Sequence, residues 1–158
     1  MRRLTLSCAL ACMTVLLSAV SGARGQDKQL AEMWSDPGTG FAIGGYDPVA
    51  YFVHLAPRHG KPGVELVIDG AAWKFLNEAN RAVFARDPTV YAPRFAGRDP
   101  LQLARGFESL GNPHNWLIED GKLYLFATPD SRSAWIQAPA NARELAGANW
   151  SDVVRATQ

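Results

Sequence analysis

Both cysteines of this chain, Cys8 and Cys12, lie within its first dozen residues. The residues around them have the character of an export signal, which is removed before the protein reaches its final form. The remaining chain would then contain no thiol, and therefore neither a disulfide nor a cysteine ligand for a structural metal ion. Such a chain has to fold on an apolar core alone.

The first 25 residues have the pattern of a secretory signal peptide. Arg2 and Arg3 form a short basic start, and an apolar run of about 17 residues follows from Leu4 to Val20, at the lower limit for a membrane span. We expect cleavage after Gly25, with a site after Ala23 as the second choice. A retained membrane anchor and a lipid anchor on the second cysteine are the alternatives. The pattern predicts a periplasmic or secreted protein.

Removal of 25 of the 158 residues leaves 133, which suits a single domain with a buried core. Of the 16 basic side chains three leave with the signal and none of the 15 acidic ones does, so the mature chain has a net charge of −2. This balance, without a basic tract, argues against nucleic acid and anionic lipid as partners. We expect no membrane span after cleavage. Five Trp, seven Phe and four Tyr are available to build the core.

Two Asp-Gly pairs, Asp69-Gly70 and Asp120-Gly121, each lie between short apolar runs. Asp-Gly tolerates the positive φ angles of a tight turn, so both pairs predict β-hairpins, with strands at 65–68 and 72–75 and at 116–119 and 123–126. The fold class expected is α+β: a small antiparallel sheet from two Asp-Gly hairpins, each followed by a helix, in a possible ββα repeat.

Four helices are expected around the hairpins. Asn77 can cap a helix over 78–86, and Thr128 can cap one from Pro129 through Trp135. Asp99 followed by proline predicts a short helix through residue 105, and a last helix is expected over 141–147, with Trp150 folding back onto the body. A helical turn near 28–34 and a strand at 49–52 are further expectations.

The two hairpin units resemble each other in sequence. At a constant offset of 51, residues 60–88 align with 111–139 without a gap, with eight identities in 29 positions. Aromatic residues of one segment align with aromatic residues of the other. This predicts two ββα units that pack their aromatic faces on a shared core. Convergence of two similar hairpin-helix units on the same turn and core residues is the alternative.

The chain is similar to exported proteins with a YHS domain. The motifs that carry the resemblance are Gly44-Gly45-Tyr46-Asp47-Pro48-Val49-Ala50-Tyr51-Phe52, Asp69-Gly70-Ala71-Ala72-Trp73-Lys74-Phe75, Tyr91-Ala92-Pro93 and Gly111-Asn112-Pro113. The resemblance covers roughly residues 42–126. Together with the signal pattern it leads us to expect a signal peptide at 1–25, a polar segment at 26–40, a YHS-like domain at 41–150 and a tail at 151–158.

Shorter members of the family resemble cysteine-based metal-binding modules found beside copper-transporting ATPases and monooxygenases. Carried onto this chain, the cysteine positions of the family are occupied by Ala50, Leu76, Asn80 and Asp99. Soft thiolates select Cu(I), and these side chains do not replace them. The resemblance therefore implies the scaffold of the family without its thiolate metal site.

Three histidines remain as candidate metal ligands: His54, His59 and His114, with Asp47 as an acidic neighbour. Neutral imidazole suits Zn(II) or Cu(II), and the repeat alignment could bring the loops of the two units together. The alternative is that the histidines are solvated loop residues and that Asp47, before a proline, forms a turn.

We therefore predict a non-catalytic periplasmic binding or accessory module of the YHS type, without the cysteine metal ligands of the family. It would present a surface or shallow pocket to a protein partner, and a membrane redox or metal-handling complex is the class we expect. Copper or zinc binding by histidine and carboxylate ligands is the second prediction. A small enzyme is the third, although no catalytic triad order, phosphate loop or dinucleotide motif is present.

Overall fold

The computed structural model describes residues 33–156, and the sequence continues beyond them at both ends. The predicted helical turn near 28–34 therefore lies largely outside the described residues. The described elements follow one another in the order η1 (Ile43–Gly45), α2 (Ala50–Val53), β1 (Glu65–Ile68), β2 (Ala71–Lys74), α3 (Glu78–Arg86), α4 (Pro88–Tyr91), η2 (Arg94–Gly97), α5 (Pro100–Ala104), β3 (Asn112–Glu119), β4 (Lys122–Phe126), α6 (Pro129–Gln137) and α7 (Asn141–Ala156).

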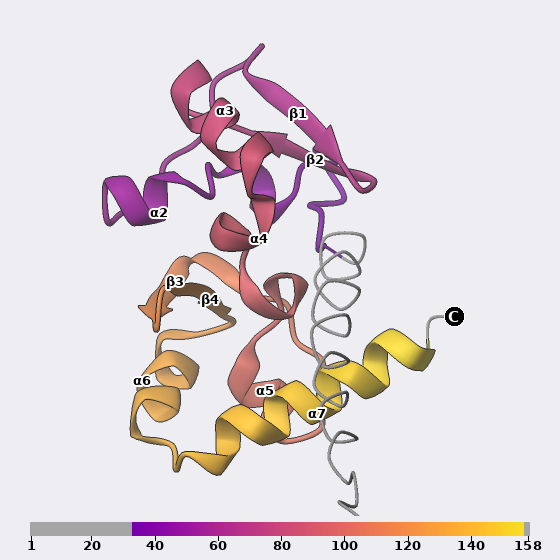
Figure 1. The fold of residues 1–158 in the computed structure, drawn as a ribbon. Coiled ribbons are helices and arrows are strands. Elements are labelled where there is room, and N and C mark those ends of the chain that lie inside the picture. Colours follow the sequence, from indigo (N-terminus) through magenta and orange to yellow (C-terminus); the bar gives the residue numbers. More distant parts are fainter. Residues whose placement is uncertain (1–32, 157–158) are drawn as a thin grey trace, which may run out of the picture.

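The elements form two units that lie one above the other (Figure 1). We call residues 41–86, which contain β1, β2 and α3, the first unit, and residues 94–137, which contain α5, β3, β4 and α6, the second unit. The short helix α4 lies between them, and α7 crosses the second unit (Figure 1). Each unit has its own two-stranded antiparallel sheet, so the α+β class is confirmed.

Both hairpins turn at the predicted Asp-Gly pairs. Asp69 and Gly70 have φ angles of 49° and 81°, and Asp120 and Gly121 have angles of 49° and 68°. Positive φ at both central residues is the geometry of the tight hairpin turn, whose twist matches that of the strands. The register is set by these turns, because the pairs that flank them are Ile68 with Ala71 and, in the second hairpin, residues 119 and 122.

The strand expected at 49–52 is wrong, because residues 50–53 form α2. Its apolar sequence has the composition of a strand, but Asp47 controls the local backbone. The Oδ1 atom of Asp47 accepts hydrogen bonds from the backbone N–H groups of Val49 (2.8 Å) and Ala50 (3.3 Å), which closes a helical turn. A side chain that satisfies the first free N–H groups favours a helix start over an extended strand.

The predicted capping residues are confirmed. Asn77 accepts from the N–H of Asn80 at the start of α3, and Thr128 accepts from the N–H of Ser131 at the start of α6. The last helix is longer than expected: α7 continues unbroken through Trp150 to residue 156, so Trp150 is buried as part of a helix face.

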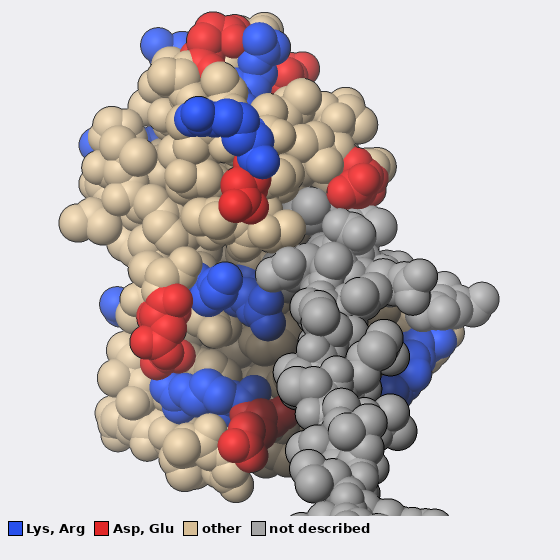
Figure 2. All heavy atoms as spheres, in the orientation of Figure 1, with Lys and Arg blue, Asp and Glu red and all other residues tan. Residues whose placement is uncertain are grey.

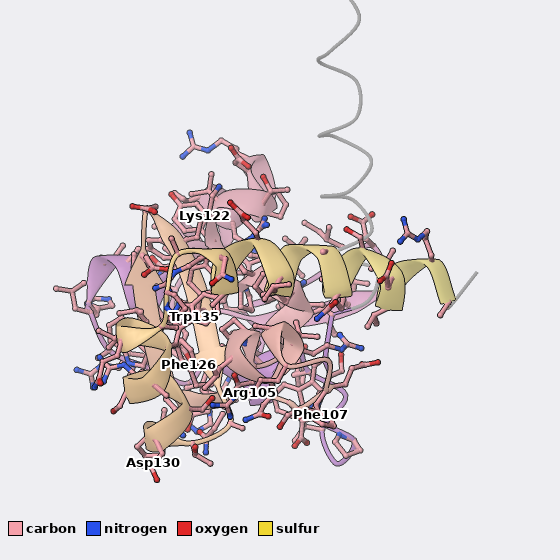
Figure 3. All side chains as sticks on the ribbon, turned by 90° about the horizontal axis from the view of Figure 1, so that it is seen from below. Arg105, Phe107, Lys122, Phe126, Asp130 and Trp135 are labelled. Atoms are coloured by element: carbon pink, nitrogen blue, oxygen red, sulfur yellow. The ribbon has the colours of Figure 1, made fainter. Side chains whose placement is uncertain are left out.

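Aromatic side chains build one core that runs through both units. Trp73 and Phe84 of the first unit have ring centroids 4.7 Å apart, and Phe126 and Trp135 of the second lie 6.3 Å apart. All four are fully buried and belong to a single hydrophobic cluster. Figure 3 shows Phe126 and Trp135 inside the second unit, between α6 and the sheet. The predicted aromatic core is confirmed, with Tyr124 half-buried beside it.

Asp47 is the buried organising residue of the first unit. Besides the two bonds at the start of α2, its Oδ2 atom accepts from the N–H of Leu76 and from the side-chain amide of Asn80, each at 2.7 Å. Asp47 is fully buried, and its four donors come from α2, the end of the hairpin and α3. One carboxylate therefore ties the three parts of the unit together.

Asp99 makes the corresponding contacts in the second unit. Its Oδ1 atom accepts from the N–H groups of Leu101 and Gln102, and its Oδ2 atom accepts from the N–H of Ala127 and the hydroxyl of Ser131. The short helix predicted after Asp99 is confirmed, and Asp99 is its N-cap. The side chain is fully buried, like Asp47, and again joins a short helix, the end of the hairpin and the next helix.

The backbone before each aspartate also corresponds. Ile43, Gly44 and Gly45 all have positive φ angles, and so do the three residues at 95–97. Gly60 donates to the carbonyl of Gly45 in the first unit, as Gly111 donates to the carbonyl of residue 97 in the second. The internal repeat remains a prediction, and these matched contacts support it more strongly than the sequence identities do.

Candidate functional site

A tyrosine and two of the three candidate histidines meet on the surface where the two units join. The phenol oxygen of Tyr46 and the Nε2 atom of His114 form a hydrogen bond of 2.7 Å. The ring of His59 stacks on the Tyr46 ring, with centroids 3.9 Å apart and an interplanar angle of 29°. We call these three residues, Tyr46, His59 and His114, the Tyr46 cluster.

Tyr46 and His59 are held together by the backbone of the first unit. They form an isolated antiparallel β-bridge, and the neighbouring Gly60 donates to the carbonyl of Gly45. Tyr46 directly follows the left-handed residues 43–45, which turn the chain so that its ring faces the loop of His59. Non-glycine residues such as Ile43 are uncommon in this conformation, and such residues cluster at functional sites.

His114 reaches the cluster because β3 is irregular. Asn112 pairs with Phe126 and Trp116 pairs with Leu125, so three residues of β3 between these pairs have no partner in β4. His114 is the middle one of the three, and its N–H donates to the side chain of Asn112. A bulge of this kind redirects a side chain and is common beside functional sites.

Tyr51 holds the bulge of β3 in place from the buried side. Its hydroxyl donates a 3.0 Å hydrogen bond to the carbonyl of Pro113, the residue before His114, and its ring meets Trp116 edge-on. Burial, followed by the negative charges available to Tyr46 and Asp47, raises the pKa of Tyr51 well above its usual range. Tyr51 is therefore a neutral hydrogen-bond donor that fixes the backbone on which His114 stands. No sequence motif indicates this role of Tyr51.

The cluster is a feature in which the two units differ. Arg98 and Leu110 occupy the positions of Tyr46 and His59 in the second unit and form the matching bridge, and Gly63 corresponds to His114 in the sequence alignment. The buried contacts of Asp47 and Asp99 are alike, whereas the aromatic and imidazole groups of the cluster have no counterpart. The two aspartates therefore belong to the scaffold that both units share, and the Tyr46 cluster is specific to one junction.

The remaining two candidate residues lie elsewhere. His54 is exposed at the carboxyl end of α2 and, within residues 33–156, makes no side-chain hydrogen bond or ring contact. Asp47 is buried, and a metal ion would have to displace its four donors. Over the described part of the chain, no three or more His, Cys, Asp or Glu side chains are grouped to hold a metal ion.

Two surface hollows lie away from the cluster. One, of about 230 Å³, lies between α5 and α6 and is lined by Arg105 and Asp130, among others. The other, of about 620 Å³, lies beside the second hairpin turn and the start of α7, where Arg143 pairs with Glu119 at 2.8 Å. Neither is lined by a histidine. Arg105 and Asp130 in the first hollow are exposed, and Arg143 and Glu119 in the second are half-buried and paired with each other.

One face of the described residues carries charges of both signs. On the described part of the face shown in Figure 2, Lys and Arg alternate with Asp and Glu and form no wide patch of one sign. Nucleic-acid binding would require a broad basic surface, which this face does not offer. None of the described helices is both long and apolar enough to cross a membrane.

Comparison of the chain with protein-family models, with curated proteins and with solved structures found no match. Two imidazoles and a phenol at the surface can stack with a partner, exchange hydrogen bonds with it, or bind a transition-metal ion.

Proposed function

We propose that this protein is a non-catalytic periplasmic binding or accessory module of the exported YHS type, which acts through the face that carries the Tyr46 cluster. The observation that carries this proposal is the meeting of Tyr46, His59 and His114, from both units, on a shared surface. Aromatic and amphipathic side chains of this kind are enriched where proteins bind partners.

The buried ionisable groups support a binding role over catalysis. A general acid or base has to reach a substrate in a pocket that excludes water. The carboxylates of Asp47 and Asp99 are instead bonded to four donors each inside the core. These hydrogen bonds give both carboxylates a structural role that explains why they are buried.

The partner class that we propose is a protein of a membrane redox or metal-handling complex. The face shown in Figure 2 carries charges of both signs, and such a face suits a protein partner better than a polyanion. The export signal expected at residues 1–25 would bring the module to the compartment where such complexes expose their outer domains.

Site-specific photo-cross-linking in the periplasm tests this proposal. A photoreactive residue at Arg58, which is exposed and precedes His59, should form one discrete adduct, and the same residue at Asp130 on α6 should not. The adduct should be lost when Tyr46→Ala and His114→Ala are combined with the probe. Equal adducts from both positions, or none from Arg58, would contradict the proposal.

A further inference from the structure

We propose that the Tyr46 cluster is a Cu(II) site whose ligands are the imidazoles of His59 and His114 and the phenolate oxygen of Tyr46. This inference rests on the proposed binding role of the same face and names the ligand that it takes. It shares no residue with the cysteine positions of the YHS family, which Ala50, Leu76, Asn80 and Asp99 occupy here.

The spacing of two ligand atoms already suits one metal ion. The Tyr46 phenol oxygen and His114 Nε2 are 2.7 Å apart. Two ligands at about 2.0 Å from a metal ion, at right angles to each other, are about 2.8 Å apart. A metal ion can therefore replace the shared proton of this hydrogen bond without a rearrangement of the backbone.

His59 supplies the third ligand by turning its ring. It lies 3.9 Å from the Tyr46 ring, on an exposed loop, and its imidazole makes no hydrogen bond within the described residues. Rotation of an exposed side chain meets little resistance. The stack with Tyr46 is exchanged for a bond to the metal ion, and the fourth position is left for water or for a group of the partner.

The donor set favours copper over other common ions. Two nitrogens and one phenolate oxygen do not suit Mg²⁺ or Ca²⁺, which take oxygen ligands in larger number. Among divalent ions at a nitrogen and oxygen site, Cu(II) binds most tightly and tolerates a planar arrangement. The absence of thiolates removes the preference for Cu(I).

Binding is an exchange of a proton for the ion. The phenol of Tyr46 releases its proton to solvent as its oxygen bonds to Cu(II), and the two imidazoles bind in their neutral form. No electron is transferred. Binding therefore weakens as the pH falls, because protonated imidazole is not a ligand.

The test is a titration of the purified protein with CuCl₂, followed by calorimetry and visible absorption. We expect one Cu(II) per chain and a phenolate-to-copper charge-transfer band. His59→Asn and His114→Asn should each weaken binding at least tenfold, and Tyr46→Phe should remove the band. His54→Asn is the matched control, because it removes an exposed histidine outside the cluster, and it should change neither quantity.

Several results would overturn the proposal. They are the absence of binding tighter than about 10 μM, equal loss in His54→Asn and His59→Asn, a band that survives in Tyr46→Phe, or tighter binding of Zn(II) than of Cu(II). A second readout is the midpoint of thermal unfolding, which Cu(II) should raise in the wild type and in His54→Asn only.

The titration and the cross-linking experiment can fail separately. An adduct at Arg58 without copper binding leaves the accessory role intact and removes the metal site. Copper binding without an adduct removes the protein partner and leaves a metal-binding protein. Circular dichroism of each variant separates loss of a ligand from loss of the fold.

Discussion

At the scale of single residues, the two buried aspartates, Asp47 and Asp99, hold the elements of each unit together. Each accepts hydrogen bonds from three backbone N–H groups and one side chain, and each joins a short helix, a hairpin and the helix that follows. The sequence predicts a short helix that begins at Asp99 and allows a turn at Asp47. The bonds to residues 76 and 127 have no local sequence signal, because they form only when distant segments fold together.

Replacement of Asp99 by alanine should destabilise the protein by about 3 kcal/mol or more, because it leaves two buried and two partly buried donors without their acceptor. The free energy of unfolding in urea measures this effect. Asp130→Ala is the control: Asp130 is exposed at the tip of α6 (Figure 3), and its loss should cost less than about 1 kcal/mol. A similar cost for both variants would show that the buried network contributes little.

Two fully buried tryptophans differ in one hydrogen bond. The indole N–H of Trp73 has no acceptor among the described residues, whereas that of Trp135 donates to Glu119 at 3.3 Å. Trp73→Phe removes an unsatisfied donor along with some volume. It should therefore cost about 1 to 2 kcal/mol less than Trp135→Phe, which also loses a bond. Urea unfolding of the two variants decides this, and a larger cost for Trp73→Phe would refute it.

At the scale of elements, local chemistry was sufficient where a turn or a cap determines the structure. The Asp-Gly turns and the caps at Asn77 and Thr128 act over a few residues, so the sequence locates both hairpins and α3 and α6. The sequence misplaced residues 49–52 as a strand, because their apolar composition suits a strand and the cap from Asp47 overrides it. The bulge in β3 also escaped prediction, since a register shift leaves no local sequence signal.

Glycine substitutions test the packing of the first hairpin. A Cβ atom at Gly60 would lie 2.5 Å from the carbonyl carbon of Lys74 and from the N atom of Phe75. Because this clash involves backbone, Gly60→Ala should destabilise the protein by at least about 2 kcal/mol. The same change at Gly147, in α7 with nothing within 4 Å of the added atom, should stabilise it by about 0.5 to 1 kcal/mol.

Opposite signs for these two variants in thermal or urea unfolding are the expected outcome. A neutral result at Gly60 would mean that the hairpin and the loop before it separate easily. The position of His59 beside Tyr46 would then not be fixed, because the hydrogen bond of Gly60 holds the loop that carries His59.

At the scale of the whole molecule, the candidate site exists only because the two units are joined. Tyr46 and His114 are 68 residues apart in the sequence, and neither belongs to a motif that predicts the other. The sequence offered the three histidines as a set, but pairing a histidine with Tyr46 required the tertiary structure. Tyr51 is the buried link beneath this junction, since its hydroxyl in the first unit donates to Pro113 in the second.

Tyr51 also makes the junction sensitive to alkaline pH. Burial holds the pKa of Tyr51 above that of a tyrosine in the unfolded chain, which is about 10. The folded protein therefore keeps a proton that the unfolded chain releases. The contribution of Tyr51 to the free energy of unfolding is therefore constant below about pH 10. It falls as the pH rises above this value, by up to about 1.4 kcal/mol per pH unit.

Tyr51→Phe should lower stability at neutral pH by about 1 kcal/mol, because the Pro113 carbonyl loses its donor. The free energy of unfolding of the variant should also fall less steeply above pH 10, because phenylalanine has no proton to release. The free energies of wild type and variant, measured in urea, should therefore become equal between pH 10 and 11. Tyr91→Phe, which changes a tyrosine outside the buried core, serves as the substitution control. Parallel curves for wild type and Tyr51→Phe would mean that Tyr51 ionises as readily in the folded protein as in the unfolded chain, and would refute this prediction.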